Sequence, residues 1–280
     1  VRTKSDAVGL VVRGVSNPFY TDIIRAIERT ITDAGFTMVM QQIGTCDDEV
    51  KCGAVMEREK RLQGIVFLGG RFDYTPADLA MLNVPFVCCS YSNRYGTLIE
   101  GEYSSVSIAD GDTAQQAVEE LYRHGHRRIA ALISRPNDQS ISQLRYEGYV
   151  QALESHGIPV DPELVISTGG FGAKDAYRAV QEKMAENVDF TALFAIADSM
   201  AIGAMRALMD AGRRIPEDCS VIAIDGLELS AYIEPPLTTL CQPMEEMGRR
   251  SAEILLDMVR HKGSHACELL PTTPVSYPHL

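Results

Sequence analysis

Residues 215–243 read IPEDCSVIAIDGLELSAYIEPPLTTLCQP. The centre of this stretch, residues 220–224, is a short apolar run rich in β-branched side chains and bounded by polar residues, which predicts a buried strand. The run stops at Asp225, so a carboxylate stands at the carboxyl end of the strand. Ligands of open α/β sheets bind at that end of the strands. Asp225 is therefore the first candidate for a binding residue.

Strands and helices alternate on both sides of this stretch. In the first half, strands are expected at residues 7–12, 37–42, 64–68 and 84–89, with helices at 20–34, 47–60 and 76–82. The second half repeats the rhythm, with strands expected at 105–108, 128–133, 164–167, 192–195 and 237–242, helices at 112–124, 142–154, 174–185, 198–211 and 245–259, and a last extended piece at 266–275. Such alternation predicts parallel, doubly wound sheets.

The two halves predict an α/β protein of two Rossmann-like lobes, each a parallel sheet flanked by helices, with a ligand cleft between them. The N-terminal lobe is expected to comprise residues 6–105 and 243–267. The C-terminal lobe is expected to comprise residues 106–242 and 268–280. This is the architecture of type I periplasmic binding proteins.

Composition limits the function. The chain has 280 residues and a formal net charge of −12, which argues against direct contact between this chain and a nucleic-acid backbone. No apolar run is long enough to span a membrane, and the first ten residues lack the apolar core of a signal peptide. The seven cysteines form no CxxC pair. We therefore expect buried, reduced thiols in a cytoplasmic protein, with no metal site and no cofactor.

Five segments resemble hallmarks of the LacI/GalR family of bacterial transcription regulators. They are the opening stretch together with SNPFYTDIIRAIE (16–28), GHRRIA (125–130), LRYEGYVQAL (144–153) and FAIADSMAIGAMRAL (194–208). The resemblance implies an effector-binding and dimerisation domain that forms a homodimer and takes a small polar effector, with a sugar expected. Family members begin with a DNA-binding helix-turn-helix and a hinge helix. VRTKSDAVGL is similar to the end of that hinge, so operator DNA is expected to be bound by a headpiece outside these residues.

Asn17, Phe19 and Tyr20 belong to the first of these segments. Asn17 before Pro18 is typical of a helix N-cap followed by proline at the first helical position. Aromatic residues at a helix start usually pack in a core or an interface. The resemblance implies that this loop faces the effector through at least one of the two aromatic residues.

Asp198, Arg145 and Asp225 carry charge. Asp198 is expected to cap the helix that follows it, and the resemblance also implies that it borders the effector pocket. Arg145 would ordinarily face solvent, but its spacing from Gly148 and Tyr149 is similar to that of the family's effector-binding arginine, whose five donors suit hydroxyls or a carboxylate. The resemblance supports Asp225 as an acceptor for ligand hydroxyls.

Three further candidates rest mainly on the resemblance. Phe171, in a GGFG loop, and Tyr91, just past a predicted strand, are implied to lie against the effector. Gln242 matches either a pocket position or an ordinary crossover position. The chain departs from the family at Ala109-Asp110, where Asp-Asn is common, at Ser90, where Asp is common, and at Tyr277, where Arg is usual.

Two other classes of protein are compatible with a doubly wound sheet. An enzyme is disfavoured because the sequence has no GxGxxG after a strand, no GxxxxGK[ST], no GxSxG and no HExxH. A secreted type I periplasmic sugar-binding protein would share the lobes and the pocket. The full-length N-terminus, either a helix-turn-helix or a signal peptide, distinguishes the second class from a regulator.

Overall fold

A computed structural model describes residues 6–14 and 17–275 of the chain. The described residues form two compact units. The first unit contains the residues up to Ile108 together with Pro243–Leu270, and the second contains Ala109–Gln242 together with the described residues from Pro271. Tyr277 lies outside the described residues.

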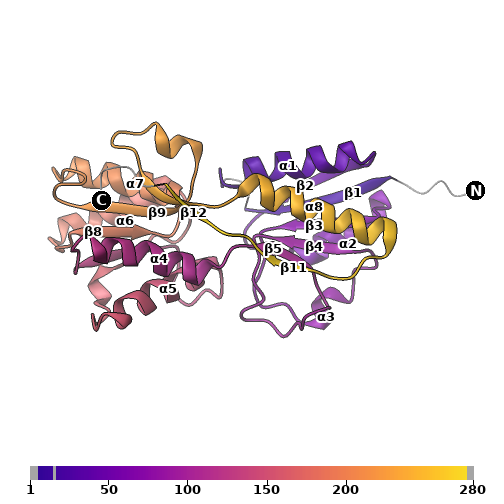
Figure 1. Cartoon of the computed structure of the whole chain (residues 1–280), viewed down its shortest axis with the longest axis horizontal. Coiled ribbons are helices and arrows are strands. Elements are labelled where there is room, and N and C mark those ends of the chain that lie inside the picture. The colour runs from indigo at the N-terminus through magenta and orange to yellow at the C-terminus, as the bar shows by residue number, and fades with distance from the viewer. Residues whose placement is uncertain (1–5, 15–16, 276–280) are drawn as a thin grey trace, which may run out of the picture. The chain divides into compact units, whose positions relative to one another are not determined.

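The first unit is built on a six-stranded sheet in the order β11-β5-β4-β3-β1-β2, with every pair parallel (Figure 1). Its strands are β1 (Ala7–Arg13), β2 (Thr37–Ile43), β3 (Gly64–Leu68), β4 (Phe86–Cys89), β5 (Ser105–Ser107) and β11 (Cys267–Leu269). Its helices are α1 (Tyr20–Asp33), α2 (Glu49–Lys60), α3 (Pro76–Leu79) and α8 (Met244–His261). Helices α1 and α8 pack on each other, and α8 also covers β3 and β4.

The second unit has a sheet in the order β12-β10-β9-β8-β6-β7, parallel except for the antiparallel pair of β10 and β12. Its strands are β6 (Ile129–Ile133), β7 (Val165–Ser167), β8 (Ala192–Ala195), β9 (Ser220–Asp225), β10 (Thr238–Cys241) and β12 (Thr273–Val275). Helix α4 (Asp110–Arg123) packs on α5 (Ile141–Ser155), and α6 (Ala173–Ala185) packs on α7 (Asp198–Asp210). Short 3-10 helices occupy Pro162–Leu164 and Glu228–Ala231.

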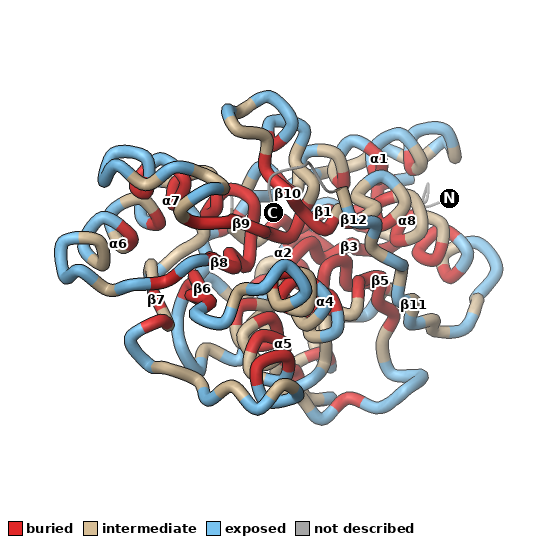
Figure 2. The backbone as a smooth tube through the Cα atoms, turned by 60° about the vertical axis from the view of Figure 1, so that its left-hand side comes forward, coloured by how far each residue is buried: buried red, intermediate tan, exposed pale blue. Residues whose placement is uncertain are grey.

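Burial follows the pattern expected of parallel sheets covered on both faces. The strands β3, β4, β6, β8 and β9 are buried along their whole length, whereas helices such as α1 bury residues at helical spacing and expose others (Figure 2). Apolar runs such as residues 64–68 in the first unit and 192–195 in the second therefore lie at the centres of the two cores. Within the described residues, no helix is both long and apolar enough to cross a membrane.

The two sheets share one connectivity. In each, the second strand in the chain lies at one edge, the first lies beside it, and the next three follow on the other side. This is the doubly wound order in which the chain reverses direction next to the first strand, and the carboxyl ends of the strands near that reversal form the usual binding edge. The α/β fold of two Rossmann-like sheets predicted from the sequence is thus confirmed.

Two predictions about the chain were wrong in detail. The last extended piece, residues 266–275, is two separate strands, because β11 joins the sheet of the first unit and β12 joins that of the second. The seven cysteines are free, but Cys46 and Cys267 are exposed, and Cys52 and Cys241 are only half-buried. Those four therefore do not belong to a core, in contrast to Cys88, Cys89 and Cys219.

Candidate functional site

The close packing of α4 against α5 positions the polar residues of the second unit. A Cβ atom on Gly148 would lie 2.1 Å from the carbonyl oxygen of Gly111, so only glycine allows the two helices to approach this closely. Tyr149, the next residue, is fully buried and donates its hydroxyl to the carbonyl of Ile129, 2.8 Å away. Together these contacts fix α5 against α4 and the sheet. As a result Arg145, one turn earlier, reaches Asp110 at the start of α4.

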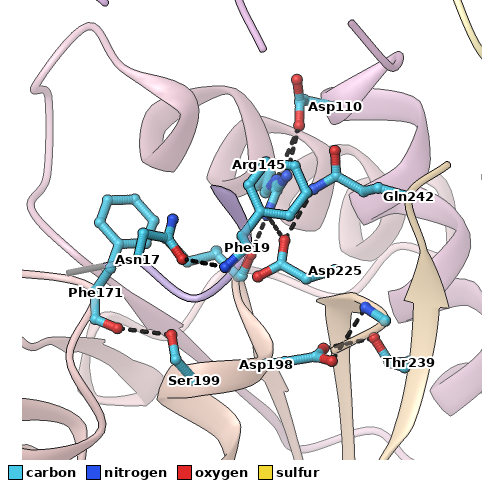
Figure 3. Close-up of polar contacts among 12 residues, drawn as sticks. Asn17, Phe19, Asp110, Arg145, Phe171, Asp198, Ser199, Asp225, Thr239 and Gln242 are labelled. Atoms are coloured by element: carbon cyan, nitrogen blue, oxygen red, sulfur yellow. Dashed lines mark hydrogen bonds and ion pairs between the residues drawn. The ribbon is translucent and has the colours of Figure 1, made fainter. Parts of the chain in front are cut away.

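Arg145 is the centre of the buried network (Figure 3). Its Nε and Nη2 each lie 2.9 Å from Oδ1 of Asp110, and its Nη1 lies 3.4 Å from Oδ1 of Asp225. Nη1 also donates to the carbonyl of Ile196, directly after β8. Only 2% of the residue is exposed. The ordinary expectation of a solvent-facing arginine was therefore wrong, since this guanidinium is taken into the protein by two carboxylates and a carbonyl.

Burial and the attraction between opposite charges act against each other on the pKa values of Arg145 and Asp110, and both pKa values are raised. Burial would lower the pKa of Arg145, but the nearby Asp110 and Asp225 carboxylates outweigh it and raise that pKa. Burial also raises the pKa of Asp110, against the attraction of Arg145. The pKa of Asp225 rises to about 7, chiefly through burial and with a contribution from the charge of Asp198. Asp225 therefore changes its protonation state near neutral pH.

Asp225 ends β9, as the sequence predicted, and Gln242 follows β10 beside it. The Nε2 of Gln242 donates to Oδ1 of Asp225 at 2.8 Å. The Oε1 of Gln242 is buried and has no hydrogen-bond partner among the residues that the structure describes. Asp225 has a φ of +151°, a backbone conformation that residues with a side chain rarely adopt and that is common at functional sites. The pair thus presents a carboxylate and a buried amide oxygen at the carboxyl edge of the sheet.

Asp198 has a different role from the one expected. It is the first residue of α7, and no side chain caps that helix. Instead its carboxylate accepts hydrogen bonds from the backbone N–H groups of Gly226 and Leu227, at 3.0 and 2.8 Å, and from the hydroxyls of Ser230 and Thr239, at 2.7 and 2.5 Å. These four donors hold the segment after β9 and the strand β10 together. Asp198 therefore links the segment that follows Asp225 to β10. The prediction that it is the N-cap of α7 was wrong.

Phe171 lies in the loop between β7 and α6 and is half-exposed. Its carbonyl accepts a hydrogen bond from the hydroxyl of Ser199, 2.8 Å away, on the first turn of α7. Figure 3 shows this bond and the ring of Phe171 at the end of the loop. The carbonyl of Phe171 is thus held by Ser199, while the residue as a whole stays partly exposed.

In the first unit, Asn17, Phe19 and Tyr20 form the turn that leads into α1. The side-chain oxygen of Asn17 accepts from the N–H of Phe19 at 3.1 Å, so a capping bond is present. The regular helix nevertheless begins only at Tyr20, with Phe19 in the N-cap position. Phe19 is buried, Tyr20 is half-buried, and their ring centroids lie 5.7 Å apart. Asn17 was expected to be the N-cap of the helix, but its side chain instead caps the turn that precedes α1.

Tyr91 lies in an aromatic cluster of the first unit. Its ring centroid is 5.5 Å from that of Phe72, 5.4 Å from that of Tyr74 and 5.8 Å from that of Tyr103. Its hydroxyl lies 2.9 Å from Oδ1 of Asn93, to which it donates. Only 3% of the residue is exposed. These contacts are those of a core residue, so the structure favours packing over effector contact for Tyr91.

The carboxyl edge of the first unit carries a second buried polar group that the sequence did not single out. Glu49, on α2, is fully buried, and its carboxylate lies 3.4 Å from Nε of Arg13 and accepts from the backbone N–H of Arg71 at 2.8 Å. Burial raises the pKa of Glu49. Arg13 ends β1 and Arg71 follows β3. Glutamate in a first helical turn is so common that no local signal marks Glu49 as buried.

Asp110 was noted in the sequence only as part of a departure from the family pattern. It is the partner of Arg145, which the spacing between residues 110 and 145 does not reveal. Among the described residues, no group of three or more His, Cys, Asp or Glu side chains is arranged to hold a metal ion. The network offers hydrogen-bond acceptors and one guanidinium, which suits the binding of a polar molecule.

Comparisons with known proteins show what the chain is similar to. The family described as "Periplasmic binding protein-like domain" matches residues 118–276. The HTH-type transcriptional regulator MalR of Clostridium butyricum is 35% identical over 95% of this chain and 79% of its own length. The HTH-type transcriptional repressor CytR of Escherichia coli K12 is 32% identical over 96% of this chain and 79% of its own length.

Solved structures show the same fold. The transcriptional regulator CelR in complex with cellobiose has a TM-score of 0.85 and 30% identity, over 98% of this chain and 84% of that one. A LacI family transcriptional regulator from Enterococcus faecium with bound ribose has a TM-score of 0.81 and 27% identity, over 96% of this chain and 97% of that one. These named proteins are transcription regulators and not enzymes. The chain belongs to the LacI family of transcription regulators, and it contains the effector-binding domain of that family.

Proposed function

We propose that this domain binds a sugar at the carboxyl edge of the second unit and thereby modulates the binding of operator DNA by a helix-turn-helix headpiece. The observation that carries the proposal is the buried group of Arg145, Asp225 and Gln242, in which Gln242 Oε1 has no partner among the described residues. A carboxylate and an amide oxygen accept hydrogen bonds from ligand hydroxyls, while the arginine donates.

The similar proteins support a carbohydrate as the effector. CelR is described in complex with cellobiose, and the Enterococcus faecium regulator with bound ribose. A secreted sugar-binding protein would bind a similar ligand, but the relatives MalR and CytR are both named as transcription regulators of the helix-turn-helix type. The regulator is therefore favoured, with a cytoplasmic location.

We propose that the two units act as the two lobes of this domain and that the domain forms a homodimer. The region around residues 227–232, together with α1, contributes to the dimer surface in this proposal. Leu229 and Tyr232 in that region are 56% and 76% exposed. Exposed large apolar side chains that are close in sequence are a common mark of protein interfaces. Size-exclusion chromatography of a Tyr232→Ser variant tests this part of the proposal.

The effector itself is found by a thermal-shift screen against sugars, sugar phosphates, purines and amino acids, followed by calorimetry of each hit. A ligand that binds the native state raises the melting temperature by mass action. We expect a sugar to bind, and Asp225→Ala to weaken that binding at least 10-fold, because its carboxylate is the charged acceptor of the site.

The control is Asp112→Asn, which changes an exposed carboxylate on α4. A sugar that binds equally well to Asp225→Ala would contradict the assignment of the site, and a purine or amino-acid hit would contradict the assignment of the ligand. Phe19→Ala and Phe171→Ala, titrated with the same sugar, test two of the aromatic contacts that the family resemblance implies.

A further inference from the structure

We infer that Asp110 makes this site selective for uncharged, hydroxyl-bearing effectors, because it holds Arg145 so that the guanidinium cannot grip a phosphate or carboxylate group. The inference deepens the proposed function and rests on it in taking the network as the effector site. It adds Asp110 as a residue that determines specificity through Arg145.

The hydrogen bonds of Arg145 carry the first part of the argument. A guanidinium has five N–H donors, and it binds an anion strongly when two parallel donors of one edge meet two oxygens. The edge formed by Nε and Nη2 is directed at Oδ1 of Asp110, at 2.9 Å from each nitrogen. Nη1 has two acceptors, the carbonyl of Ile196 and the carboxylate of Asp225. Only one N–H of Nη2 remains, so no edge offers two free donors.

The balance of charge carries the second part. Two buried carboxyl groups, those of Asp110 and Asp225, pair with one buried guanidinium, and the buried carboxylate of Asp198 adds a further negative charge that acts on Asp225. None of the four residues is more than 4% exposed, so water and salt screen their interactions weakly. An anionic effector would add negative charge to a site that already has an excess. A neutral ligand adds none, and its hydroxyls can donate to Oε1 of Gln242, which has no other partner among the described residues.

Asp110 is distinct from the other two carboxyl residues in what it controls. Asp198 is held by four donors of its own unit, and Asp225 faces Gln242. Asp110 alone occupies the Nε edge of Arg145. Position 110 is also one at which this chain departs from the family pattern, in which an uncharged asparagine is common. An asparagine there would remove one negative charge from the site and weaken the hold on the arginine.

Inorganic phosphate is the probe that tests the inference, because it needs no knowledge of the effector. The whole domain is titrated with phosphate against sodium chloride of equal ionic strength, and binding is followed by the 15N–1H resonance of the Arg145 Nε, assigned by its absence from Arg145→Lys. The proteins are the wild type, Asp110→Ser, which removes the carboxylate, Asp110→Asn, which removes only the charge, and the exposed-site control Asp112→Asn.

We expect phosphate to leave the Arg145 resonance of the wild type and of Asp112→Asn unchanged. Asp110→Ser should bind phosphate at least 10-fold more tightly than the wild type, with the resonance of Arg145 shifted, and Asp110→Asn should lie between the two. A phosphate-dependent shift at Arg145 in the wild type overturns the inference. So does a folded Asp110→Ser that gains no phosphate binding.

Two safeguards keep the outcome clear. If Asp110→Ser does not fold, the isosteric Asp110→Asn decides in its place, and the absence of any gain in phosphate binding then overturns the inference. The proposed function fails separately, when no sugar binds the wild type in the screen. Failure of the inference appears instead in the phosphate titration, so the two failures are distinguishable.

Discussion

The carboxyl edges of the two sheets share one strand order but differ in chemistry. In the second unit the edge carries a single arginine, Arg145, whose guanidinium contacts the carboxylates of Asp110 and Asp225. The third buried carboxylate, that of Asp198, bonds to the segment after β9 and to β10. In the first unit the comparable edge carries Glu49 between Arg13 and the backbone of Arg71, beside a cluster of aromatic rings. The comparison shows that the doubly wound topology supplies the place for a ligand, whereas the side chains decide which unit provides its polar contacts.

The largest expected effect comes from separating the helices that build the edge of the second unit. Gly148→Ala should lower the free energy of unfolding by about 3 kcal/mol, because the added methyl group meets the carbonyl of Gly111 on a neighbouring helix. It should also weaken sugar binding, since Arg145 and Asp110 are then displaced from each other. Chemical denaturation and calorimetry measure the two effects.

The first unit offers a matched comparison for this variant. Gly248 on α8 is packed against α1 in the same way, with a Cβ atom placed 2.5 Å from the carbonyl of Ile23. Gly248→Ala should destabilise the first unit without moving Arg145. Gly111→Ala, whose added methyl group would have only an ordinary contact, 3.6 Å from Leu144, is the tolerated control. Equal stability of Gly148→Ala and Gly111→Ala would show that the helix contact is not as close as described.

A second prediction concerns pH, and it tests the edge of the second unit through Asp225. The pKa of Asp225 is about 7 in the folded protein and has an ordinary value of 3.8. The folded state therefore binds the proton more tightly than the unfolded state does. Protonation of Asp225 stabilises the fold fully below pH 4, and this contribution is lost as the pH rises through 7.

Between pH 5 and pH 7 the wild type should lose about 2 kcal/mol of stability relative to Asp225→Asn, which does not titrate. Urea denaturation of both proteins at each pH measures the difference. Asp112→Asn serves as the control and should follow the wild type. Parallel curves for the wild type and Asp225→Asn would mean that Asp225 does not titrate in this range.

The smallest expected effect tests the aromatic cluster of the first unit. Tyr91→Phe removes a hydroxyl that donates to Asn93 and keeps the ring, so we expect a loss of about 1 kcal/mol in stability. Sugar affinity should not change, because the ring lies among Phe72, Tyr74 and Tyr103. A fall in affinity without a fall in stability would instead place Tyr91 at the effector, as the family resemblance implies.

The fold was more predictable than the site because its signals are local. The apolar runs that became β3, β8 and β9 are continuous, and glycines such as Gly35 and Gly125, both with positive φ, mark the ends of helices. Periodicity and caps of this kind can be recognised within about ten residues. The last strands were harder to place, because the sequence divided this piece between the lobes after residue 267, whereas β11, Cys267–Leu269, joins the sheet of the first unit.

The contacts of the site depend on residues far apart in the chain. Arg145 was singled out by its spacing from Gly148 and Tyr149, but its burial follows from Asp110 and Asp225, which lie 35 and 80 residues away. Asp198 has the pattern of a helix cap, yet its carboxylate bonds to groups after β9 and in β10. The prediction of a helix cap considered only the residues next to Asp198. It failed because the hydrogen-bond partners of Asp198 are distant in the sequence.

The sequence alone determined the alternation of strands and helices, the family, and the position of Asp225 at the end of a buried strand, since each depends on neighbouring residues. Only the tertiary structure decided that Arg145 is buried and that Asp110 occupies its Nε edge. It also decided that Asp198 bonds to the segment after β9 and to β10. The physical reason is that a charge enters a protein interior only together with its partners. Those partners are brought together by the packing of α4 on α5 and by the order of the strands.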